Sequence, residues 1–284
     1  MESSPAQLAF NVFTPEGGAE NKSPVIFMHG VTASKENWYD IPQKTANATK
    51  RIVYALDARN HGDSEWRDYF TFDCNVDDLF HFMDSNYVKK AILVGHSMGG
   101  IIGIKAALRQ PERVEKLVVE DMYVKRVTRA MCDSILVYLK LANEALDKVP
   151  PSVSEETAKK FIVQYIYKNL PPELENKVSK RKWTDIELKK TADGRYTYRY
   201  NAGPVEKLIK NIDDMYAENT GLYKGAALFI YGKLSPYLVG EEANHIKEFF
   251  PNAEMHGIYN ASHRVHTDSP QEFTETLLKF LLKE

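Results

Sequence analysis

The sequence predicts an α/β protein in which a mostly parallel central sheet is flanked by helices and interrupted by an inserted helical cap. Three observations lead to this prediction. In the first part of the chain, short continuous apolar runs, typical of strands buried on both faces, alternate with helical patterns. A long region of amphipathic helical pattern follows. Strand and helix patterns then alternate again up to the C-terminus.

The first part of the chain supplies five strands and two helices of the predicted core. Strands are expected over residues 6–14, 25–28, 52–56, 91–95 and 117–119. Gly17-Gly18 ends the first of them. Helices are expected over residues 74–87 and 98–110, and the second stops before Pro111. Because helices connect successive buried strands, the strands are expected to run parallel.

The middle of the chain changes character. Amphipathic helices are expected over residues 126–148, 154–169, 173–189 and 204–217, with an extended aromatic link over 196–201. The core pattern resumes with strands over 226–232 and 253–259 and helices over 240–250 and 270–283. We therefore expect a core made of residues 1–124 and 224–284, and a cap, or lid, made of residues 125–223.

Composition narrows the classes of protein that this chain can represent. With 284 residues, of which 43% are hydrophobic, it can bury a sizeable core. A formal net charge of -2 argues against a general nucleic-acid binder. The basic run Lys180-Arg181-Lys182 has acidic neighbours, which favour a solvated helix face over a lipid contact. Cys74 and Cys132 do not form a disulfide framework.

The sequence shows no targeting or membrane-spanning segment. No apolar run is long enough to cross a bilayer, and Met1-Pro5 does not begin a secretory signal. We therefore expect an intracellular protein, cytoplasmic or, if a targeting extension is absent from this chain, mitochondrial. We expect it to act as a monomer or weak dimer on a small molecule or lipid, without nucleic acid.

The run Gly95-His96-Ser97-Met98-Gly99-Gly100 is the most informative motif. It follows an apolar strand and opens a helix, so a serine stands at the apex of a sharp strand-to-helix turn. Small residues are needed there because the backbone approaches itself closely. This context predicts that Ser97 is a nucleophile and that the Met98 amide faces an oxyanion. The alternative is a Gly-rich turn with an idle serine.

A serine hydroxyl needs a neighbouring base to become a nucleophile at neutral pH. His263 follows the last predicted strand, so it and Ser97 both lie at the carboxyl ends of strands, where sites form in parallel sheets. His266, three residues further on, is the rival candidate. His29 and His96 flank glycines in turns, where structural roles are expected, His61 lies in a loop, and His256 lies inside a predicted strand.

The acid that orients the base is harder to place. The loop after strand 226–232 begins with Lys233-Tyr237, which contains no carboxylate. Glu120-Asp121 ends the preceding core strand, and because side chains alternate along a strand, only one of the two is expected to face the site. We favour Asp121. Glu120 and Glu206 are the alternative carboxylates, and Asp121 could instead cap the next helix.

Two further loops belong to the predicted site. The oxyanion hole needs two amide donors, and Val31, in the loop after strand 25–28, is expected to supply the one that complements Met98. The polar run Asp57-Ser64 is expected to brace the site by hydrogen bonds. The spacings typical of zinc sites, phosphate-binding loops and dinucleotide fingerprints do not occur in the sequence, so we expect neither a metal nor a cofactor.

These residues together resemble the α/β-hydrolase superfamily across essentially the whole chain. Within it, Asp57-Ser64 and Gly95-Gly100 are similar to the branch of α/β-hydrolase domain-containing protein 11 and its bacterial esterase relatives. Leu234-Ser-Pro-Tyr237 is similar to the Asn-Ser-Pro-Tyr of that branch, which likewise lacks an acid there. The resemblance implies the α/β-hydrolase fold and an esterase or lipase acting on acyl esters, acylglycerols among the candidates, without a cofactor.

The resemblance maps the nucleophile onto Ser97, the base onto His263 and the branch's strand-end aspartate onto Asp121. The chain also departs from the branch. The late acid that follows an Arg-x-Asn has no counterpart, because Arg199-Tyr200-Asn201 is followed by Ala-Gly-Pro. Arg264 stands where an aromatic residue usually follows the histidine.

The sequence therefore predicts a serine hydrolase that cleaves carboxylic esters through a Ser-His-Asp triad and an acyl-enzyme. The alternative is a ligand-binding sensor on the same fold with slow or absent turnover, because fold alone does not fix function. The missing acid after strand 226–232 is what keeps that alternative open.

Overall fold

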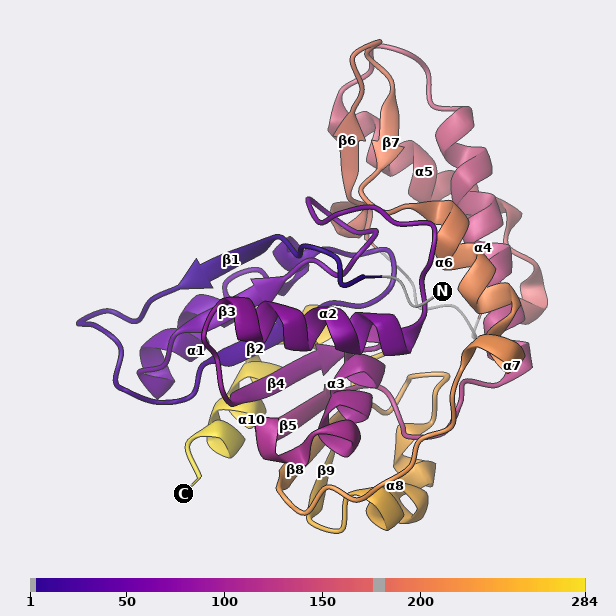
Figure 1. The fold of residues 1–284 in the computed structure, drawn as a ribbon. Helices are drawn as coiled ribbons and strands as arrows, with labels where there is room; N and C mark the ends of the chain where they lie inside the picture. Colours follow the sequence, from indigo (N-terminus) through magenta and orange to yellow (C-terminus); the bar gives the residue numbers. More distant parts are fainter. Residues whose placement is uncertain (1–3, 176–181, 284) are drawn as a thin grey trace.

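The computed structural model describes residues 4–175 and 182–283. Its main sheet has seven strands, namely β1 (Phe10–Phe13), β2 (Val25–Met28), β3 (Val53–Leu56), β4 (Ala91–His96), β5 (Val114–Glu120), β8 (Ala226–Gly232) and β9 (Ala253–Ile258). Their spatial order is β1-β3-β2-β4-β5-β8-β9. Only β1 runs antiparallel to its neighbour, so the predicted mostly parallel α/β fold is confirmed (Figure 1).

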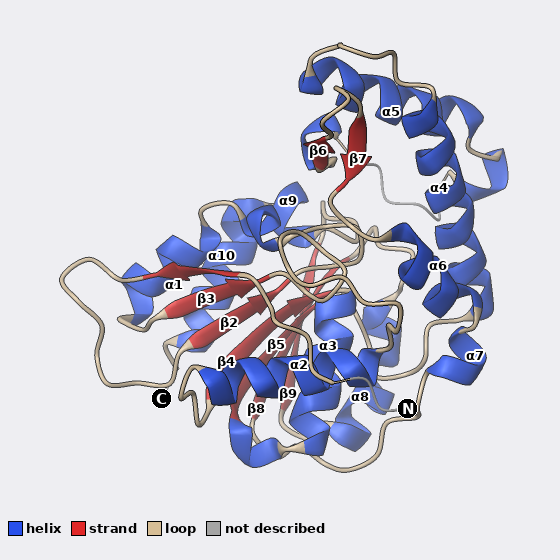
Figure 2. Ribbon diagram, turned by 45° about the horizontal axis from the view of Figure 1, so that its top comes forward, coloured by secondary structure: helices blue, strands red, loops and turns tan. Residues whose placement is uncertain are grey.

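Helices cover both faces of the sheet (Figure 2). They are α1 (Ile41–Thr49), α2 (Phe72–Ser85), α3 (Met98–Arg109), α8 (Ala243–Phe249), α9 (Val265–Asp268) and α10 (Pro270–Leu281). Successive residues of one strand enter opposite layers: Leu93 packs in the cluster with α2 and α3, whereas Val94 packs in the cluster with α1 and α10. This double burial explains why the strands read as continuous apolar runs.

Between β5 and β8 the chain leaves the sheet and forms an insertion. Its helices are α4 (Arg129–Asp147), α5 (Glu155–Asn169), α6 (Ala202–Lys210) and α7 (Ile212–Met215). α4 packs against both α5 and α6, and the insertion lies beyond the carboxyl ends of the strands (Figures 1 and 2). Thr128 and Ser154 cap α4 and α5 by accepting backbone hydrogen bonds from Met131 and Thr157.

The helix expected over residues 173–189 is wrong. Two short 3₁₀ turns, Pro172–Leu174 and Trp183–Asp185, occupy part of this range, and β6 (Leu188–Lys190) follows. β6 pairs antiparallel with β7 (Tyr196–Tyr198) across a turn in which Gly194 has a φ of +81°. A positive φ at glycine and alternating tyrosines favour a hairpin over a helix. Residues 176–181, with Lys180 and Arg181 of the basic run, lie outside the described residues.

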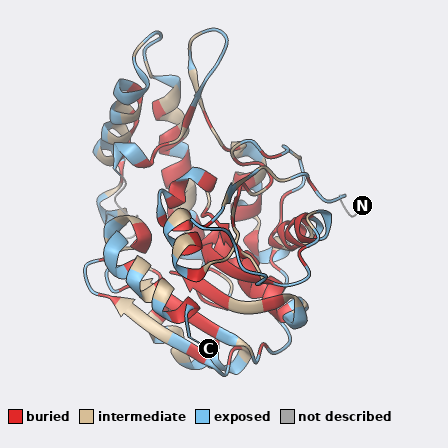
Figure 3. Cartoon of the chain, turned by 90° about the vertical axis from the view of Figure 1, so that its left-hand side faces the viewer, coloured by how far each residue is buried: buried red, intermediate tan, exposed pale blue. Residues whose placement is uncertain are grey.

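Backbone contacts join the insertion to the core. The amide of Asn201 donates to the carbonyl of Asn60 at 2.8 Å, and the amide of Gly62 donates to the carbonyl of Arg199 at 2.7 Å. The apolar cluster on the α2 and α3 face also continues into the insertion through Tyr138 and Leu208, and Figure 3 shows the buried residues of both regions. The insertion is thus packed onto the edge of the sheet where the strands end.

In the chain as described, no helix combines the length and the apolar character needed to cross a bilayer.

Candidate active site

Ser97 stands at the apex of the turn between β4 and α3, as the sequence predicts. Its φ of +52° and ψ of −111° are strained for a residue with a side chain. The turn is tight enough that a Cβ on Gly95 would lie 2.2 Å from the Gly99 carbonyl oxygen, and one on Gly99 would lie 2.1 Å from that of Met28. Glycine at both positions is therefore a steric requirement of the turn that presents Ser97.

His263 and Asp121 are joined by a hydrogen bond. The Nδ1 atom of His263 lies 2.7 Å from Oδ2 of Asp121, and the aspartate is fully buried whereas the histidine is partly exposed. His263 follows β9, and Asp121 comes directly after β5 with a φ of +49°. The structure therefore brings together the histidine and the acid that the sequence favours. Asp121 is not the cap of α4, because Thr128 holds that position.

The end of β8 and the loop that follows it donate hydrogen bonds to Asp121, although residues 233–237 of that loop contain no carboxylate. The Gly232 amide donates to Asp121 Oδ1 at 3.0 Å, and the Ser235 hydroxyl donates to Oδ2. The ring of Tyr237 stacks on that of His263 with centroids 4.3 Å apart. Sequence reasoning missed both side chains, although the Leu234-Ser-Pro-Tyr237 run was the available signal. These two hydrogen bonds hold the Asp121 carboxylate in place beside His263.

The rival residues form a pair of their own. Both the backbone amide and Nδ1 of His266 lie 2.8 Å from Oε1 of Glu120, and the two side chains are at most 1% exposed. The Nε2 atom of His266 lies 3.3 Å from Oδ1 of Asn37. Glu206, the other alternative acid, accepts a hydrogen bond from Asn143 within the insertion at 2.8 Å. Neither Glu120 nor Glu206 is therefore the partner of His263 in this structure.

His96 supports the loop that carries His263. Its Nε2 atom donates to the backbone carbonyl of His263 at 2.9 Å. Burial lowers the pKa of His96 well below its ordinary value, and the neighbouring His263 and His266 act in the same direction. A neutral ring with its proton on Nε2 is the state that this hydrogen bond requires.

The loop after β2 lies against the serine. A Cβ on Gly30 would come within 3.3 Å of the Cβ of Ser97, and Val31 lines the same pockets as Ser97. The His29 carbonyl accepts the amide of Gly99 at 3.1 Å, which ties this loop to the start of α3. Helix α3 begins at Met98, so its positive N-terminal end lies beside the serine. Met98 follows Ser97 directly, and Val31 lines the same pockets as Ser97, so both residues expected to supply the oxyanion-hole amides lie at this site.

The Asp57-Ser64 loop is a hydrogen-bonded structural unit. Asp57 is fully buried and accepts the amide of Lys35 at 2.7 Å and its ammonium group at 2.7 Å. The same ammonium group also bonds Asp63, which in turn pairs with Arg199 of the insertion at 2.7 Å. The loop therefore joins the core to the insertion, and none of these bonds involves Ser97, His263 or Asp121.

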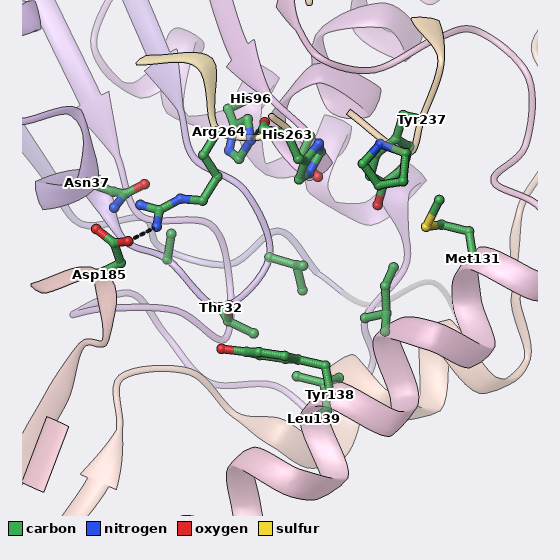
Figure 4. A pocket seen from close by; sticks show the side chains of 15 residues that line it. Thr32, Asn37, His96, Met131, Tyr138, Leu139, Asp185, Tyr237, His263 and Arg264 are labelled. Atoms are coloured by element: carbon green, nitrogen blue, oxygen red, sulfur yellow. Dashed lines mark hydrogen bonds and ion pairs between the residues drawn. The ribbon is translucent and has the colours of Figure 1, made fainter. Parts of the chain in front are cut away.

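The pocket at Ser97 has two lobes. An apolar lobe lies between α3 and the insertion and is lined by Phe70, Ile101, Val205, Leu208 and Ile209, among others. The second lobe holds His263 and is also lined by the polar side chains of Thr32, Asn37, Asp185 and Arg264. Figure 4 shows Asn37, Asp185 and Arg264 together on one side of this lobe and Thr32 apart from them, near Tyr138. Ser97, Val31 and Tyr237 line both lobes. A bond at the serine can therefore have an apolar group on one side and a polar group on the other.

Within residues 4–175 and 182–283, no three His, Cys, Asp or Glu side chains are grouped so as to hold a metal ion.

Comparisons with known proteins agree on the type of fold. Residues 23–270 match the family described as alpha/beta hydrolase fold. The chain is 31% identical over 280 residues to a Danio rerio protein named sn-1-specific diacylglycerol lipase ABHD11, across 98% of this chain and 83% of that protein. It is 28% identical over 279 residues to the Mus musculus protein of the same name, across 98% and 86% of the two chains.

A solved structure extends the likeness to three dimensions. A marine microorganism esterase matches this chain with a TM-score of 0.75 and 28% sequence identity, across 97% of this chain and 99% of the esterase. The resemblance that the sequence motifs indicate is therefore confirmed.

Proposed function

The chain belongs to the alpha/beta hydrolase fold family and is a carboxylic ester hydrolase, and from this premise we propose that it works through Ser97, His263 and Asp121. One observation carries the proposal: the hydrogen bond of 2.7 Å between His263 and Asp121, with His263 and Ser97 lining one pocket. A nucleophile, a base and a group that orients the base are the elements of acyl transfer by serine.

The proposed reaction has two halves. In the first, Ser97 Oγ attacks the ester carbonyl while His263 Nε2 takes its proton, and the amides of Met98 and Val31 stabilise the oxyanion. The tetrahedral intermediate collapses, His263 returns the proton to the leaving alcohol, and an acyl-enzyme remains. In the second half, water attacks the acyl-enzyme while His263 takes a proton from it. The bond between the acyl group and Ser97 Oγ then breaks, His263 returns the proton to Oγ, and the carboxylic acid leaves.

Asp121 has two tasks in this scheme. It accepts a hydrogen bond from the Nδ1–H group of His263, which leaves Nε2 to receive the proton of Ser97. Its negative charge also stabilises the imidazolium that forms in each half-reaction. The amide of Gly232 and the hydroxyl of Ser235 hold the carboxylate in place from the neighbouring strand end.

We also propose that the substrates are acyl esters, with acylglycerols among them. The apolar lobe beside Ser97 is suited to an acyl chain, because Val205, Leu208 and Ile209 are at most 8% exposed and present only hydrocarbon to it. Relatives named diacylglycerol lipases support the same class.

The first test is steady-state hydrolysis of p-nitrophenyl esters of increasing acyl length, with Ser97→Ala as the blank. We expect turnover that depends on Ser97, with an optimum length set by the apolar lobe. A phosphonate that labels serine should label Ser97 and not the variant. Labelling of another residue would contradict the assignment of the nucleophile, and a reactive Ser97 without turnover would favour a ligand sensor.

A further inference from the structure

The second lobe of the pocket is lined by four polar side chains, here named the polar end: Thr32, Asn37, Asp185 and Arg264. Figure 4 shows Asn37, Asp185 and Arg264 together on one side of the pocket, opposite Tyr237 and Met131. All four side chains belong to residues that are at least nine-tenths buried. Buried polar groups normally have hydrogen-bond partners within the protein, so a member of the polar end without a partner needs an explanation.

Two members of the polar end each have a side-chain polar atom for which the described residues show no hydrogen bond. The Thr32 hydroxyl is buried and has no hydrogen-bond partner among the described residues. Asn37 uses its amide oxygen toward His266 Nε2 at 3.3 Å, while no bond of its amide nitrogen is found in the part of the chain that the structure describes. Thr32 also has a φ of +67°, a strained conformation for a β-branched residue. An unpaired hydroxyl that lines the same pocket as Ser97 and His263 points to a ligand as the missing partner.

The other two members neutralise each other. The Arg264 guanidinium forms an ion pair with Asp185, and both side chains are at most 7% exposed. Arg264 comes from the core, directly after His263, whereas Asp185 comes from the insertion. Asp185 also accepts from the Tyr39 hydroxyl at 3.3 Å and from the Lys182 amide at 2.7 Å. The polar end therefore offers hydrogen-bond donors and acceptors without a net charge.

We propose that the polar end binds the alcohol part of the ester, that this part is an uncharged group carrying hydroxyls, and that Thr32, Asn37 and Arg264 determine specificity for it. The proposal rests on the proposed function and adds the orientation of the substrate. The acyl chain occupies the apolar lobe, and the leaving alcohol points toward Arg264.

The chemistry of a hydroxyl matches this end of the pocket. A hydroxyl accepts from the Asn37 amide and the Arg264 guanidinium, and it donates to Asp185 or Thr32. A cationic or anionic headgroup would compete with one member of the buried ion pair and leave the other uncompensated, which is costly. The site therefore selects against charged alcohols as well as for hydroxylated ones.

The test compares two esters that differ only in the alcohol. We would measure kcat/KM for 1-butyrylglycerol and for propyl butyrate, which share the acyl chain and the three alcohol carbons and differ in two hydroxyls. The native enzyme should prefer the glycerol ester. Thr32→Val, which keeps the shape and removes the hydroxyl, should lower that preference by roughly 3- to 10-fold, the size expected for one neutral hydrogen bond.

Two further variants complete the design. Arg264→Met combined with Asp185→Leu removes the ion pair without leaving a buried charge, and it should lower the preference by roughly 10-fold or more. Ile209→Val, in the apolar lobe, is the matched control. It should change kcat/KM for both esters by the same factor and leave their ratio as it is. Because the Thr32 hydroxyl has no partner to lose, thermal unfolding of Thr32→Val should match that of the native protein.

The outcomes separate the two proposals. Equal kcat/KM for the two esters, or a ratio that Thr32→Val and the double variant both leave unchanged, would overturn the role of the polar end while the ester hydrolase stands. Preference for a charged alcohol, tested with butyrylcholine, would overturn it as well. Failure to hydrolyse any of these esters in a way that depends on Ser97 would instead count against the proposed function.

Discussion

His263, in the loop after β9, and His266, in α9, lie three residues apart in the sequence, and each bonds one of two adjacent carboxylates at the end of β5. The side chain of His263, bonded to Asp121, is 15% exposed and lines the pocket with Ser97. The side chain of His266, bonded to Glu120, is 1% exposed and is enclosed by Asn37 and the Trp38 ring. Both pairs consist of an imidazole and a carboxylate, but only the imidazole of His263 lines the pocket that holds Ser97.

This difference shows that a histidine beside a carboxylate is not by itself a catalytic base. Proton transfer needs a ring nitrogen within reach of the reacting group, and in the proposed mechanism His263 uses Nε2, because Nδ1 is bonded to Asp121. In His266 both ring nitrogens have partners, Glu120 and Asn37. We infer that the pair of His263 and Asp121 contributes to turnover, whereas the pair of His266 and Glu120 stabilises the fold around it.

Replacing each histidine by glutamine tests the comparison most strongly. His263→Gln should lower kcat by roughly 10⁴- to 10⁶-fold, because the base is lost. His266→Gln should keep turnover within about tenfold and lower the free energy of unfolding by about 1–3 kcal/mol, because a buried hydrogen bond is disturbed. Ester hydrolysis and urea unfolding of both variants measure this. Equal losses of kcat would show that the pairs are not divided as proposed.

Replacing the two carboxylates, Asp121 and Glu120, should give the next largest difference in kcat. Asp121→Asn should lower kcat by roughly 10⁴-fold with the fold intact, because the amide no longer fixes the correct tautomer of His263. Glu120→Gln is the matched control at the adjacent position and should act mainly on stability. Steady-state hydrolysis and circular dichroism of the two variants decide the matter. Turnover of Asp121→Asn within a few-fold of the native value would place the acid elsewhere.

Ser235 gives a smaller test of the comparison between the two histidine–carboxylate pairs, because its hydroxyl donates to Asp121 and not to Glu120. Ser235→Ala removes the hydroxyl that donates to Asp121 Oδ2 and leaves the Gly232 amide on Oδ1, so kcat should fall by roughly 3- to 30-fold. Ser262→Ala is the control, since the Ser262 hydroxyl bonds Asp268 and not the site. A kcat for Ser235→Ala equal to that of the control would show that this bond does not contribute to catalysis.

Buried neutral histidines give the smallest effect, and it concerns stability alone. Burial lowers the pKa of His61 to about 3. In the unfolded chain a histidine takes up a proton below about pH 6.5, so between pH 6.5 and about 3 the unfolded state binds the extra proton and stability falls as the pH falls. The loss is at most about 1.4 kcal/mol per pH unit for this residue.

Urea unfolding between pH 7.5 and 5 measures this slope. His61→Gln should unfold with a shallower dependence on pH than the native protein. An identical dependence in the two proteins would mean that His61 does not titrate differently on unfolding.

Much of the core could be predicted because its signals are local. β8 follows the apolar run at residues 226–232, and the turn at Ser97 follows its glycines. Helix α1 was not expected, because its polar sequence and its Pro42 carry little apolar periodicity. The hairpin β6–β7 was also not expected, since the charged residues before it fit a helix as well as a strand.

In the candidate site, too, the features with local sequence signals could be predicted and the others could not. Spacing and strand ends indicate Ser97, His263 and Asp121. They do not indicate which histidine bonds which carboxylate, because that choice depends on how β5, β8 and the last loop pack together. The roles of Ser235 and Tyr237 depend on the same packing. Only the assembled sheet edge places the Ser235 hydroxyl on Asp121 and the Tyr237 ring on His263.

The ion pair between Arg264 and Asp185 has a consequence for exchanging parts between relatives. Ser97, His263 and Asp121 all belong to the core, so a foreign segment could replace residues 125–223 without removing any of the groups proposed to react. Arg264 would, however, lose its buried counterion, one residue from His263. A functional chimaera would therefore have to bring an acidic residue to the place of Asp185, or carry an uncharged residue at position 264.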